Sequence, residues 1–596
     1  MAELHSLQKD FSQEGNVQQL ITQHIDLWTG AVKEKSSAGR GGSSKRELYG
    51  IKKLRELILE LAVRGKLVSQ DPSDEPASVL LDLIAAEKAE LVKQGKLKKP
   101  KKLPEISEDE KPFELPEGWE WARLDSVYDV RDGTHDSPKN IPEGIPLITS
   151  KNLSSGTLNF DDVKYISLED HKKIIERSKV DKYDILFAMI GSIGNPVIVD
   201  TDIDFSIKNV ALFKYIDLKL SSPVFLQLYL EKMSAELRRE ASGGVQKFVS
   251  LGKLRNCPIS LPPLNEQHRI VAKVDELMAL CDLLEQQTES SLDDHQTLVQ
   301  TLLDTLLQSP DAEELEQNWQ RLSAHFDLLF TTEQSIDQLK QTILQLAVMG
   351  KLVPQDPNDE PASELLKRIA AEKEELVKQK KIKKQKPLPP ISDDEKPFQL
   401  PKGWEWARVN DIAMFTTSGS RDWAKYYSES GALFVTMGNL SKSSYQLRLD
   451  NLRYVNPPQN SEGARTRLEA YDLLISITGE VGNLGLIPEG FGEAYINQHT
   501  CLLRFMPEAR NRYFPEFMCS QLAKIQFNAP QRGIKNSFRL GDVGEMLVSL
   551  PPITEQHRIV AKVDQLMVLC DQLKAKLADS KTTQLNLTDA LVAQAV

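Results

Sequence analysis

The sequence predicts two copies of a mixed α/β (α+β) domain, separated by long antiparallel coiled-coil helices within one tandem duplication. Residues 260–282 match residues 549–571 at 19 of 23 positions, and residues 111–123 match residues 396–408 at 11 of 13. The inserts between these matched segments have largely diverged. A repeated frame around two individual inserts is typical of a symmetric scaffold that presents two domains of different specificity.

Length and composition favour a cytoplasmic protein of several domains. A chain of 596 residues has room for several hydrophobic cores. No apolar run approaches the roughly 20 residues of a membrane span, and the N-terminus lacks a secretory signal pattern. The five cysteines have no C-x-x-C spacing, which favours reduced core thiols. The net charge is −12, but both inserts are close to neutral, so their basic residues can still gather on a DNA-binding face.

A helical region precedes each insert. Residues 53–68 carry the i, i+3, i+4, i+7 apolar spacing of an amphipathic helix, and a second helix is expected at 79–94. Both recur between residues 339 and 401. Residues 1–35 are expected to be weakly helical, and the Gly/Ser-rich, charged segment 31–50 is expected to be a flexible linker.

Each insert is expected to be a compact mixed α/β domain, because short apolar runs alternate with turn signals. In the first insert the runs are GIPLITSKNL, DKYDILFAMIGSIGNPVIV and VALFKYI, and helices are expected at 168–178 and 222–240. In the second they are ALFVTMGNL, AYDLLISITGEVGNLGLI and CLLRF, with a helix near 514–526.

A heptad pattern follows each insert and predicts a coiled-coil helix, with Asn265 or Thr554 as its expected N-cap. The competing interpretation, a helix packed only on its own insert, is disfavoured because the stripe runs for several turns and recurs. The polar stretch 288–297 is expected to interrupt the first seam before Leu298, Leu302 and Leu306 resume it. The seam residues, also candidates for docking partner proteins, are Ile270, Val274, Leu277 and Leu284, and Ile559, Val563, Leu566 and Leu573.

The order of these parts predicts a circular arrangement. If the helix after the first insert packs on the helical region before the second, symmetry requires the C-terminal helix to pack on the first helical region. The chain then closes on itself about a pseudo-two-fold axis. A 40-residue helix spans about 60 Å, enough to hold two domains one or more DNA turns of about 34 Å apart.

No catalytic or metal-binding constellation is evident. The Gly-Lys pairs are followed by Leu and therefore lack the hydroxyl of a phosphate-binding loop. Asn456-Pro457-Pro458 is followed by Gln459, without the aromatic residue that a flipped adenine requires. His268 and His557 have no second ligand at helical spacing, which favours packing or capping over metal binding. The sequence therefore predicts no catalytic residue, no metal site and no cofactor in this chain.

Polar and glycine-rich loops of the inserts carry the candidate DNA-binding residues. Lys and Arg can contact phosphates, and Asn, Gln, Ser, Thr and His can donate to or accept from base edges. A plain hairpin turn and a solvated loop remain alternative interpretations of these segments, as does a solvated linker for the lysine clusters at 96–102 and 380–386. The candidates are Thr134, His135, Lys139, Lys151, Asn152, Ser192, Gln246, Lys247 and Lys253, and Ser420, Arg421, Asn439, Lys535, Asn536 and Arg539.

The layout resembles the specificity subunits of type I restriction–modification systems, in a branch with a longer scaffold. The resemblance covers about residues 45–596. Each insert opens on a PxGWxW-type motif, at Pro116 to Trp121 and at Pro401 to Trp406. Each closes on an LPPLxEQxxIV-type motif, at Leu261 to Val271 and at Leu550 to Val560.

The resemblance implies that each insert is a target recognition domain for one half of a bipartite, asymmetric DNA site. It implies that the helices set the spacing and dock two modification (adenine methyltransferase) subunits. S-adenosylmethionine is then expected on those partners, and ATP and Mg on restriction subunits that complete the complex. The expected regions are an extension and linker (1–50), a repeated helical region (51–110), target recognition domain 1 (111–263), a central helical spacer (264–395), target recognition domain 2 (396–552) and a C-terminal coiled coil (553–596).

Two other classes of protein fit parts of the pattern. One is a two-headed, sequence-specific DNA-binding regulator without methyltransferase partners. The other is a coiled-coil scaffold that binds only proteins. A neighbouring methyltransferase gene would favour the restriction–modification interpretation over the first, and salt-reversible retention on duplex DNA would argue against the second.

Overall fold

The computed structural model describes residues 17–35, 45–99, 102–241, 247–310, 312–385, 387–458, 462–529 and 538–596. The chain divides into two compact units. Unit 1 comprises Met1–Ser290 and Lys581–Val596, and unit 2 comprises Ser291–Ser580. No helix in the described parts of the chain is long and apolar enough to cross a membrane.

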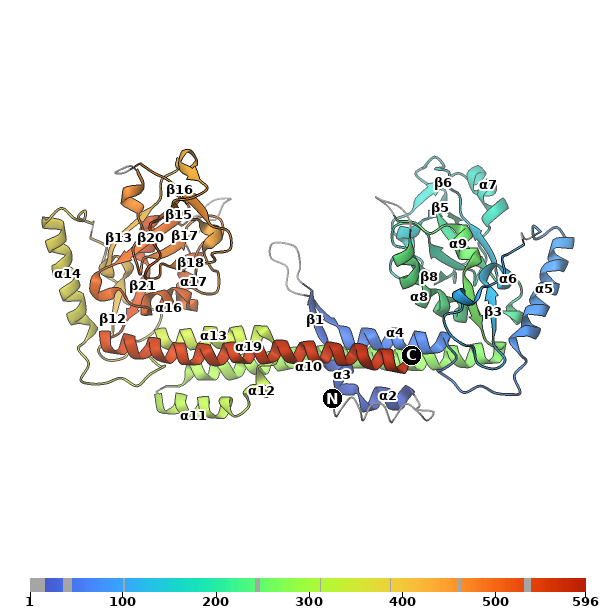
Figure 1. The fold of residues 1–596 in the computed structure, drawn as a ribbon, viewed down its shortest axis with the longest axis horizontal. Helices are drawn as coiled ribbons and strands as arrows, with labels where there is room; N and C mark the ends of the chain where they lie inside the picture. The colour runs from blue at the N-terminus through green and yellow to red at the C-terminus, as the bar shows by residue number, and fades with distance from the viewer. Residues whose placement is uncertain are drawn as a thin grey trace. The chain divides into compact units, whose positions relative to one another are not determined.

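Unit 1 begins with helices and a hairpin that lead into the first insert (Figure 1). Strands β1 and β2 pair antiparallel, from Val32↔Leu48 to Lys35↔Lys45. The prediction of a flexible linker over 31–50 is therefore wrong for residues 32–35 and 45–48, which form these strands. The elements are α2 (Val17–Gln23), α3 (Ile25–Gly30), β1 (Val32–Lys35), β2 (Lys45–Leu48), α4 (Tyr49–Val63) and α5 (Ala77–Lys93).

The first insert contains two small sheets, as the alternating apolar runs predict. A four-stranded sheet has the order β4-β10-β7-β8, and a three-stranded sheet has the order β6-β5-β9. The helices expected at 168–178 and 222–240 are confirmed as α7 (Leu168–Ser178) and α8 (Pro223–Glu240). The strands are β4 (Asp129–Asp132), β5 (Ile145–Ile148), β6 (Lys164–Ile166), β7 (Ile185–Ala188), β8 (Gly194–Ile198), β9 (Ser206–Ile207) and β10 (Val210–Lys214); short helices are α6 (Leu124–Val127) and α9 (Leu251–Asn256).

The second insert has the same topology despite its different sequence. Its sheets have the orders β13-β20-β17-β18 and β14-β16-β15-β19, so only β14 has no counterpart strand in the first insert. The helix expected near 514–526 is two helices, α16 (Tyr513–Cys519) and α17 (Gln521–Asn528). The other elements are α15 (Val409–Ile412), β13 (Ala413–Ser418), β14 (Tyr427–Ser428), β15 (Ala432–Val435), β16 (Arg453–Val455), β17 (Leu473–Ser476), β18 (Leu484–Leu486), β19 (Ala494–Ile496), β20 (Thr500–Phe505) and α18 (Leu540–Glu545).

In unit 2 three helices pack into one core: the C-terminal part of α10 (Leu264–Gln308), α13 (Glu333–Val348) and the N-terminal part of α19 (Ile553–Ala595). Gln338 donates to Gln300, and Lys351 to the carbonyl of Leu307, so α13 runs parallel to α10. The ion pairs Lys340–Asp571 and Lys574–Asp337 show that α13 runs antiparallel to α19. The two long helices are consequently antiparallel, as the sequence predicts. The remaining helices are α11 (Ala312–Ser323), α12 (Phe326–Leu329) and α14 (Ala362–Lys378).

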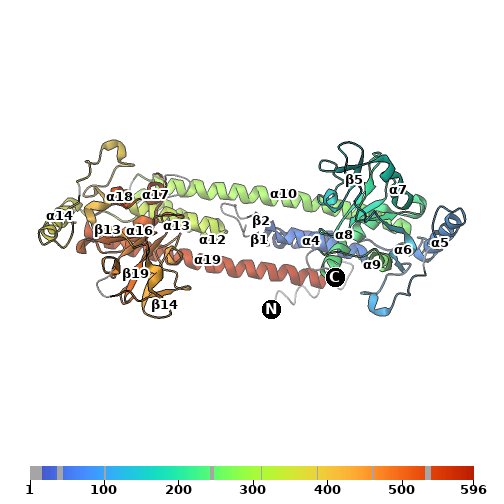
Figure 2. The ribbon, with the colours of Figure 1, turned by 90° about the horizontal axis from the view of Figure 1, so that it is seen from above.

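Unit 1 contains the matching bundle, built from α4, the N-terminal part of α10 and the C-terminal end of α19. Figure 2 shows α4 between the other two. Arg55 of α4 forms ion pairs with Asp282 and Glu285 of α10. On its other side, Tyr49 donates to Asp589 of α19 at 2.7 Å. The predicted packing of the C-terminal helix on the first helical region is confirmed.

Helix α10 departs from the sequence prediction in two respects. It begins at Leu264 rather than after Asn265, and α19 begins at Ile553 rather than after Thr554. It also continues through 288–297 without a break. Beyond this stretch Val299, Leu303 and Leu306 are buried, which confirms Leu306, whereas Leu298 is exposed and Leu302 is half-buried.

Each insert meets its helices at a joint, which in unit 1 consists of Val63, Gly65, Gln70, Trp119, Ser260 and Glu266. The strand that opens the insert, β3 (Glu120–Arg123), pairs antiparallel with the strand that closes it, β11 (Pro258–Leu261). Trp119 donates its indole N–H to Glu266 at 2.9 Å, and Gln70 donates to the other oxygen of Glu266 at 3.1 Å. Ser260 donates to the carbonyl of Val63 at 2.7 Å.

The same joint recurs in unit 2, where β12 (Glu405–Arg408) pairs with β21 (Leu547–Leu550). Trp404 donates to Glu555 at 2.9 Å, Gln355 donates to Glu555 at 3.0 Å, and Ser549 donates to the carbonyl of Val348 at 2.6 Å. The two sequence motifs that are duplicated most faithfully are therefore the two sides of this joint. Unit 2's joint consists of Val348, Gly350, Gln355, Trp404, Ser549 and Glu555.

A positive-φ glycine makes each joint possible. Gly65 has φ +69°, and a Cβ there would lie 2.5 Å from Pro116 and 2.9 Å from Trp119. Gly350 has φ +70° and meets Pro401 and Trp404 at similar distances. Any side chain at these turns would force the tryptophan away from the end of the helix.

The duplication also extends further toward the N-terminus than sequence comparison indicates. His24 and His325 begin short helices with nearly the same backbone, at φ −118°, ψ 27° and φ −123°, ψ 20°. Both are followed by apolar side chains that are buried, Trp28 and Leu329. The pair α2–α3 is thus the counterpart of α11–α12, a relation that the sequence shows only as His-x-Asp-Leu.

Candidate nucleic-acid interface

The candidate loops of the first insert meet at one edge of its sheets. The four strands of the larger sheet reach this edge at Asp132, Ala188, Gly194 and Val210. Isolated bridges join Thr134 to Lys208 and Ile190 to Phe248. We call residues 132–139, 189–193, 208–209 and 247–249 the first loop edge. Four segments distant in sequence therefore present their side chains together.

The second insert has an equivalent edge. Ser418 pairs with Cys501, and a bridge joins Ser420 to Asn497. Ile477 donates its backbone N–H to His499, and Phe538 donates to Ile477. Residues 418–421, 477–482, 497–499 and 538–539 form the second loop edge. Equivalent topology with different side chains is what two domains of different specificity require.

A buried carboxylate organises the first loop edge. Asp132 is 3% exposed and accepts hydrogen bonds from His135, at 2.9 Å, and from Arg177 at the end of α7. The other ring nitrogen of His135 lies 3.0 Å from Asn209. Arg177 stays largely exposed, so Asp132 holds one potential hydrogen-bond donor in a fixed position, whereas both ring nitrogens of His135 already have partners within the chain. Sequence reasoning identified His135 but missed Arg177, because α7 lies about 40 residues away.

A histidine also occupies the second loop edge. His499 lies within hydrogen-bond distance of Thr478, at 2.8 Å, and of Gln498, also at 2.8 Å. The sequence prediction did not include these residues. The Asn-Gln-His run immediately before the apolar strand CLLRF was the available signal, since it places three polar side chains in a tight turn.

The comparison with protein families covers both inserts and the helix after each. Residues 116–293 and 401–580 match the family model described as the type I restriction modification DNA specificity domain. The two matches together include more than half of the chain. The chain belongs to this family.

Two curated specificity subunits match over nearly their full length. The Escherichia coli type I restriction enzyme EcoAI specificity subunit is 44% identical, over 98% of this chain and 100% of that protein. The EcoEI specificity subunit, also from Escherichia coli, is 42% identical over 96% and 99%. A solved HsdS subunit from Thermoanaerobacter tengcongensis covers 82% of this chain, with 19% identity and a TM-score of 0.39.

Several of the predicted DNA-binding residues are exposed at or beside the loop edges. In the first insert these are Lys139, Lys151, Ser192 and Lys247. In the second they are Arg421 and Arg539. Thr134 and Ser420 are half-buried and take part in the backbone bridges of their edges. Lys253 forms an ion pair with Glu240, which reduces the charge that it can offer to a phosphate.

Asn152 and Asn439 are corrections to the sequence prediction. Both are buried, at 5% and 3% exposure. The oxygen of Asn152 accepts from the backbone and hydroxyl of Thr149, and its nitrogen donates to two backbone carbonyls. Asn439 makes the same four bonds, with Thr436 as its partner. These amides hold a loop in place and have no donor or acceptor left for a base.

Three predicted DNA-binding residues, Gln246, Lys535 and Asn536, lie outside the described residues.

The predicted docking residues on the helices require a second correction. Their exposed fractions are 7% or less, because these side chains form the cores of the chain's own bundles, as the coiled-coil prediction expects, and are therefore not accessible to a partner protein. They are Ile270, Val274, Leu277, Leu284, Ile559, Val563, Leu566 and Leu573.

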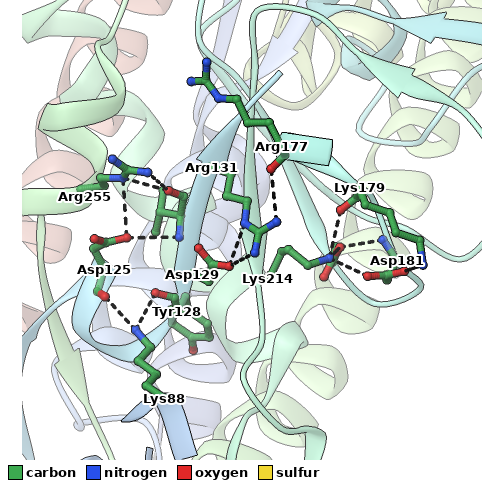
Figure 3. Close-up of polar contacts among 12 residues, drawn as sticks. Lys88, Asp125, Tyr128, Asp129, Arg131, Arg177, Lys179, Asp181, Lys214 and Arg255 are labelled. Carbon is green, nitrogen blue, oxygen red and sulfur yellow. Dashed lines mark hydrogen bonds and ion pairs between the residues drawn. The ribbon is translucent and has the colours of Figure 1, made fainter. Parts of the chain in front are cut away.

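A buried lysine fastens α5 to the base of the first insert. Figure 3 shows Lys88 pointing at the carbonyl oxygens of Asp125 and Tyr128, which it reaches at 2.8 and 3.0 Å. Burial lowers the pKa of Lys88 to about 8. Lys373 of α14 donates to the carbonyl of Asn410 in the equivalent way. A lysine of the helix before each insert thus binds backbone carbonyls of that insert. This attachment does not depend on the side chains of the insert.

A buried aspartate ends the turn before the central strand of each insert. Asp184 and Asp472 are both 1% exposed and both follow a tyrosine with positive φ. Arg504 donates to both oxygens of Asp472 at 2.7 Å. Lys214 reaches only one oxygen of Asp184, and Oδ1 has no hydrogen-bond partner among the described residues. An open pocket of about 410 Å³ has Asp184 and Lys214 in its wall, and Arg504 holds the position in β20 that Lys214 holds in β10.

We expect Lys214→Arg to stabilise the first insert. The guanidinium would donate to the unsatisfied oxygen of Asp184, and one net hydrogen bond contributes about 1 kcal/mol. Thermal unfolding of the full chain measures the effect. Arg504→Lys is the matched control and should lower the unfolding temperature. An unchanged or lower unfolding temperature for Lys214→Arg would contradict this prediction.

Proposed function

We propose that this chain is the DNA sequence-specificity subunit of a type I restriction–modification complex in the cytoplasm. Each insert reads one half of a bipartite, asymmetric DNA site. The observation that carries the proposal is the pair of loop edges, which have one topology, different exposed side chains and the same joint to the helices. A protein that recognises different DNA sequences needs side chains that differ between its recognition domains, on a backbone fold that stays the same.

Family membership supports a division of labour within the complex. The relatives are named as specificity subunits of restriction enzymes. We propose that two modification subunits bind this chain and carry S-adenosylmethionine for adenine methylation, and that restriction subunits carry ATP and Mg. This chain then has no catalytic step of its own. The adenine to be methylated must leave the duplex and enter a partner's pocket.

The exposed residues of the loop edges fit two kinds of contact. Lys139, Lys151, Lys247, Arg421 and Arg539 can neutralise phosphates, which positions the protein without reading sequence. Arg177 and Gln498 carry donors that suit base edges in the major groove. Because Asp132 already orients Arg177, little side-chain entropy is lost when this residue binds.

We expect the full chain, with its modification partner, to retain duplex DNA of mixed sequence in a salt-dependent way. If six to ten phosphates are contacted, affinity should fall by about 10³ to 10⁵ between 50 and 200 mM salt. Titration of labelled duplex at several salt concentrations measures this. Absence of retention at low salt would support a protein-only scaffold instead.

Methylome sequencing of a host that carries the intact system would then report both half-sites and their spacing. A gapped motif with methylated adenine in each half is the expected result. DNA binding without any methylated motif would indicate a two-headed regulator.

A further inference from the structure

The buried glutamate of each joint is unusual for a structural contact. Glu266 and Glu555 are each 1% exposed, and burial raises the pKa of both carboxyl groups. Their two oxygens accept from a tryptophan indole and a glutamine amide rather than from a cation. An apolar side chain could fill the same space without the desolvation penalty of a carboxylate. Stability alone therefore does not account for a carboxylate at this position.

Hydrogen bonds supply direction, which apolar packing does not. In unit 1, Glu266 lies in the first turn of α10, Trp119 precedes the strand that opens the insert, and Gln70 follows α4. Gln70 also donates to the carbonyl of Gly65 at the end of α4. One carboxylate thus fixes the angle among two helices and the insert. The ion pair between Arg269 and Asp74, at 2.7 Å, braces the same corner.

The joint is repeated where the inserts are not. Its bonds in unit 2 agree with those in unit 1 to within 0.1 Å, at 2.9 and 3.0 Å against 2.9 and 3.1 Å. The brace is repeated as well, between Arg558 and Asp359 at 2.6 Å. A feature that is the same under two different inserts serves something that both inserts need, and not the identity of the bases.

We propose that Glu266 and Glu555 are positioning residues that fix the orientation of each recognition domain on its helix and so determine which spacing between half-sites is accepted. This inference rests on the proposed function. The glutamates act through Trp119 and Trp404 and contact no DNA themselves. A loosened joint lets a domain swing, and a swinging domain tolerates a half-site displaced along and around the duplex.

The test measures binding to duplexes that differ only in spacer length. The DNA that the wild-type complex selects from a random pool is remade with the spacer one base pair shorter or longer, which rotates one half-site by about 35°. The wild type should discriminate against these duplexes by about tenfold or more. In Glu266→Ala and in Trp119→Phe the ratio of affinities for the selected and the altered spacer should fall to about two- to threefold. The base preferences inside each half-site should stay unchanged. Glu266→Gln, which keeps an acceptor for Trp119, should retain most of the discrimination.

A matched control separates positioning from stability. Leu186→Ala destabilises the core of the first insert, where Leu186 is fully buried, but does not touch the joint. It should leave the spacer ratio unchanged. Wild-type ratios in both Glu266→Ala and Trp119→Phe would overturn the inference while leaving the proposed function intact. Failure of the wild type to select any bipartite DNA would overturn both.

Discussion

Replacing residues 124–257 by the corresponding insert of a relative will change one half of the recognised DNA site and leave the other half unchanged. The exchange keeps both strands of the joint, since Pro258–Leu261 pairs with Glu120–Arg123. Specific binding exceeds non-specific binding by about 10³ or more. We therefore expect the hybrid to lose at least that factor on the original site and to recover it on a site with one new half. Methylome sequencing of cells that carry the hybrid measures both halves at once.

The reciprocal exchange in the second insert is the control. Replacing residues 409–546, between the strands β12 and β21, should change only the other half. A hybrid that alters both halves, or neither, would contradict modular recognition. One contact deserves care in the choice of donor: Lys232 of α8 lies 3.4 Å from Glu60 of α4. A donor from a 44% identical relative has evolved on a similar helix and suits this contact better than an unrelated insert.

The sequence predicts the frame well because the frame is duplicated. Local rules located α4, α7 and α8, and the heptad spacing identified buried residues such as Ile270 and Ile559. Symmetry then predicted that the C-terminal helix returns to the first helical region. The same rules failed for α10 across 288–297, where the helix continues through polar residues although none of them is buried.

Contacts between distant segments could not be predicted. Nothing in LPPLNEQ indicates that Glu266 accepts a hydrogen bond from Trp119, 147 residues earlier. Asn152 and Asn439 were wrongly predicted to bind DNA. From sequence alone, an asparagine in a polar loop whose amide faces solvent cannot be distinguished from one whose amide closes the loop. The sequence contains no indication of Arg177 as a candidate, because only the folded structure brings α7 next to Asp132.

Recurring buried groups outside the loop edges explain why two divergent inserts adopt one topology. What recurs is a small set of constraints, among them a positive-φ tyrosine before a buried aspartate and an asparagine that closes the loop after β5 or β15. These groups satisfy backbone and turn geometry inside each insert. The side chains between them are then free to differ, and those differences are available for specificity.

Inserting four residues into both α10, after Gln287, and α19, after Lys576, will lengthen the preferred spacer by one base pair. Four helical residues add about 6 Å and about 40° of rotation beyond a full turn. One base pair adds about 3.4 Å and about 35°. Rotation decides the outcome, because a half-site that is out of phase faces away from its domain. Spacer selection from a pool with fixed half-sites measures the change.

A seven-residue insertion at the same two positions is the informative control. It preserves the heptad seam of Leu284 and Leu573 and adds about 10.5 Å, but the helix ends only about 20° out of phase. Three further base pairs would match that length and rotate the half-site by about 105°. No spacer satisfies both conditions, so binding should weaken at every length. If the seven-residue variant instead accepts a spacer three base pairs longer with full affinity, the domains rotate freely on their helices, and the rigid-spacer interpretation is wrong.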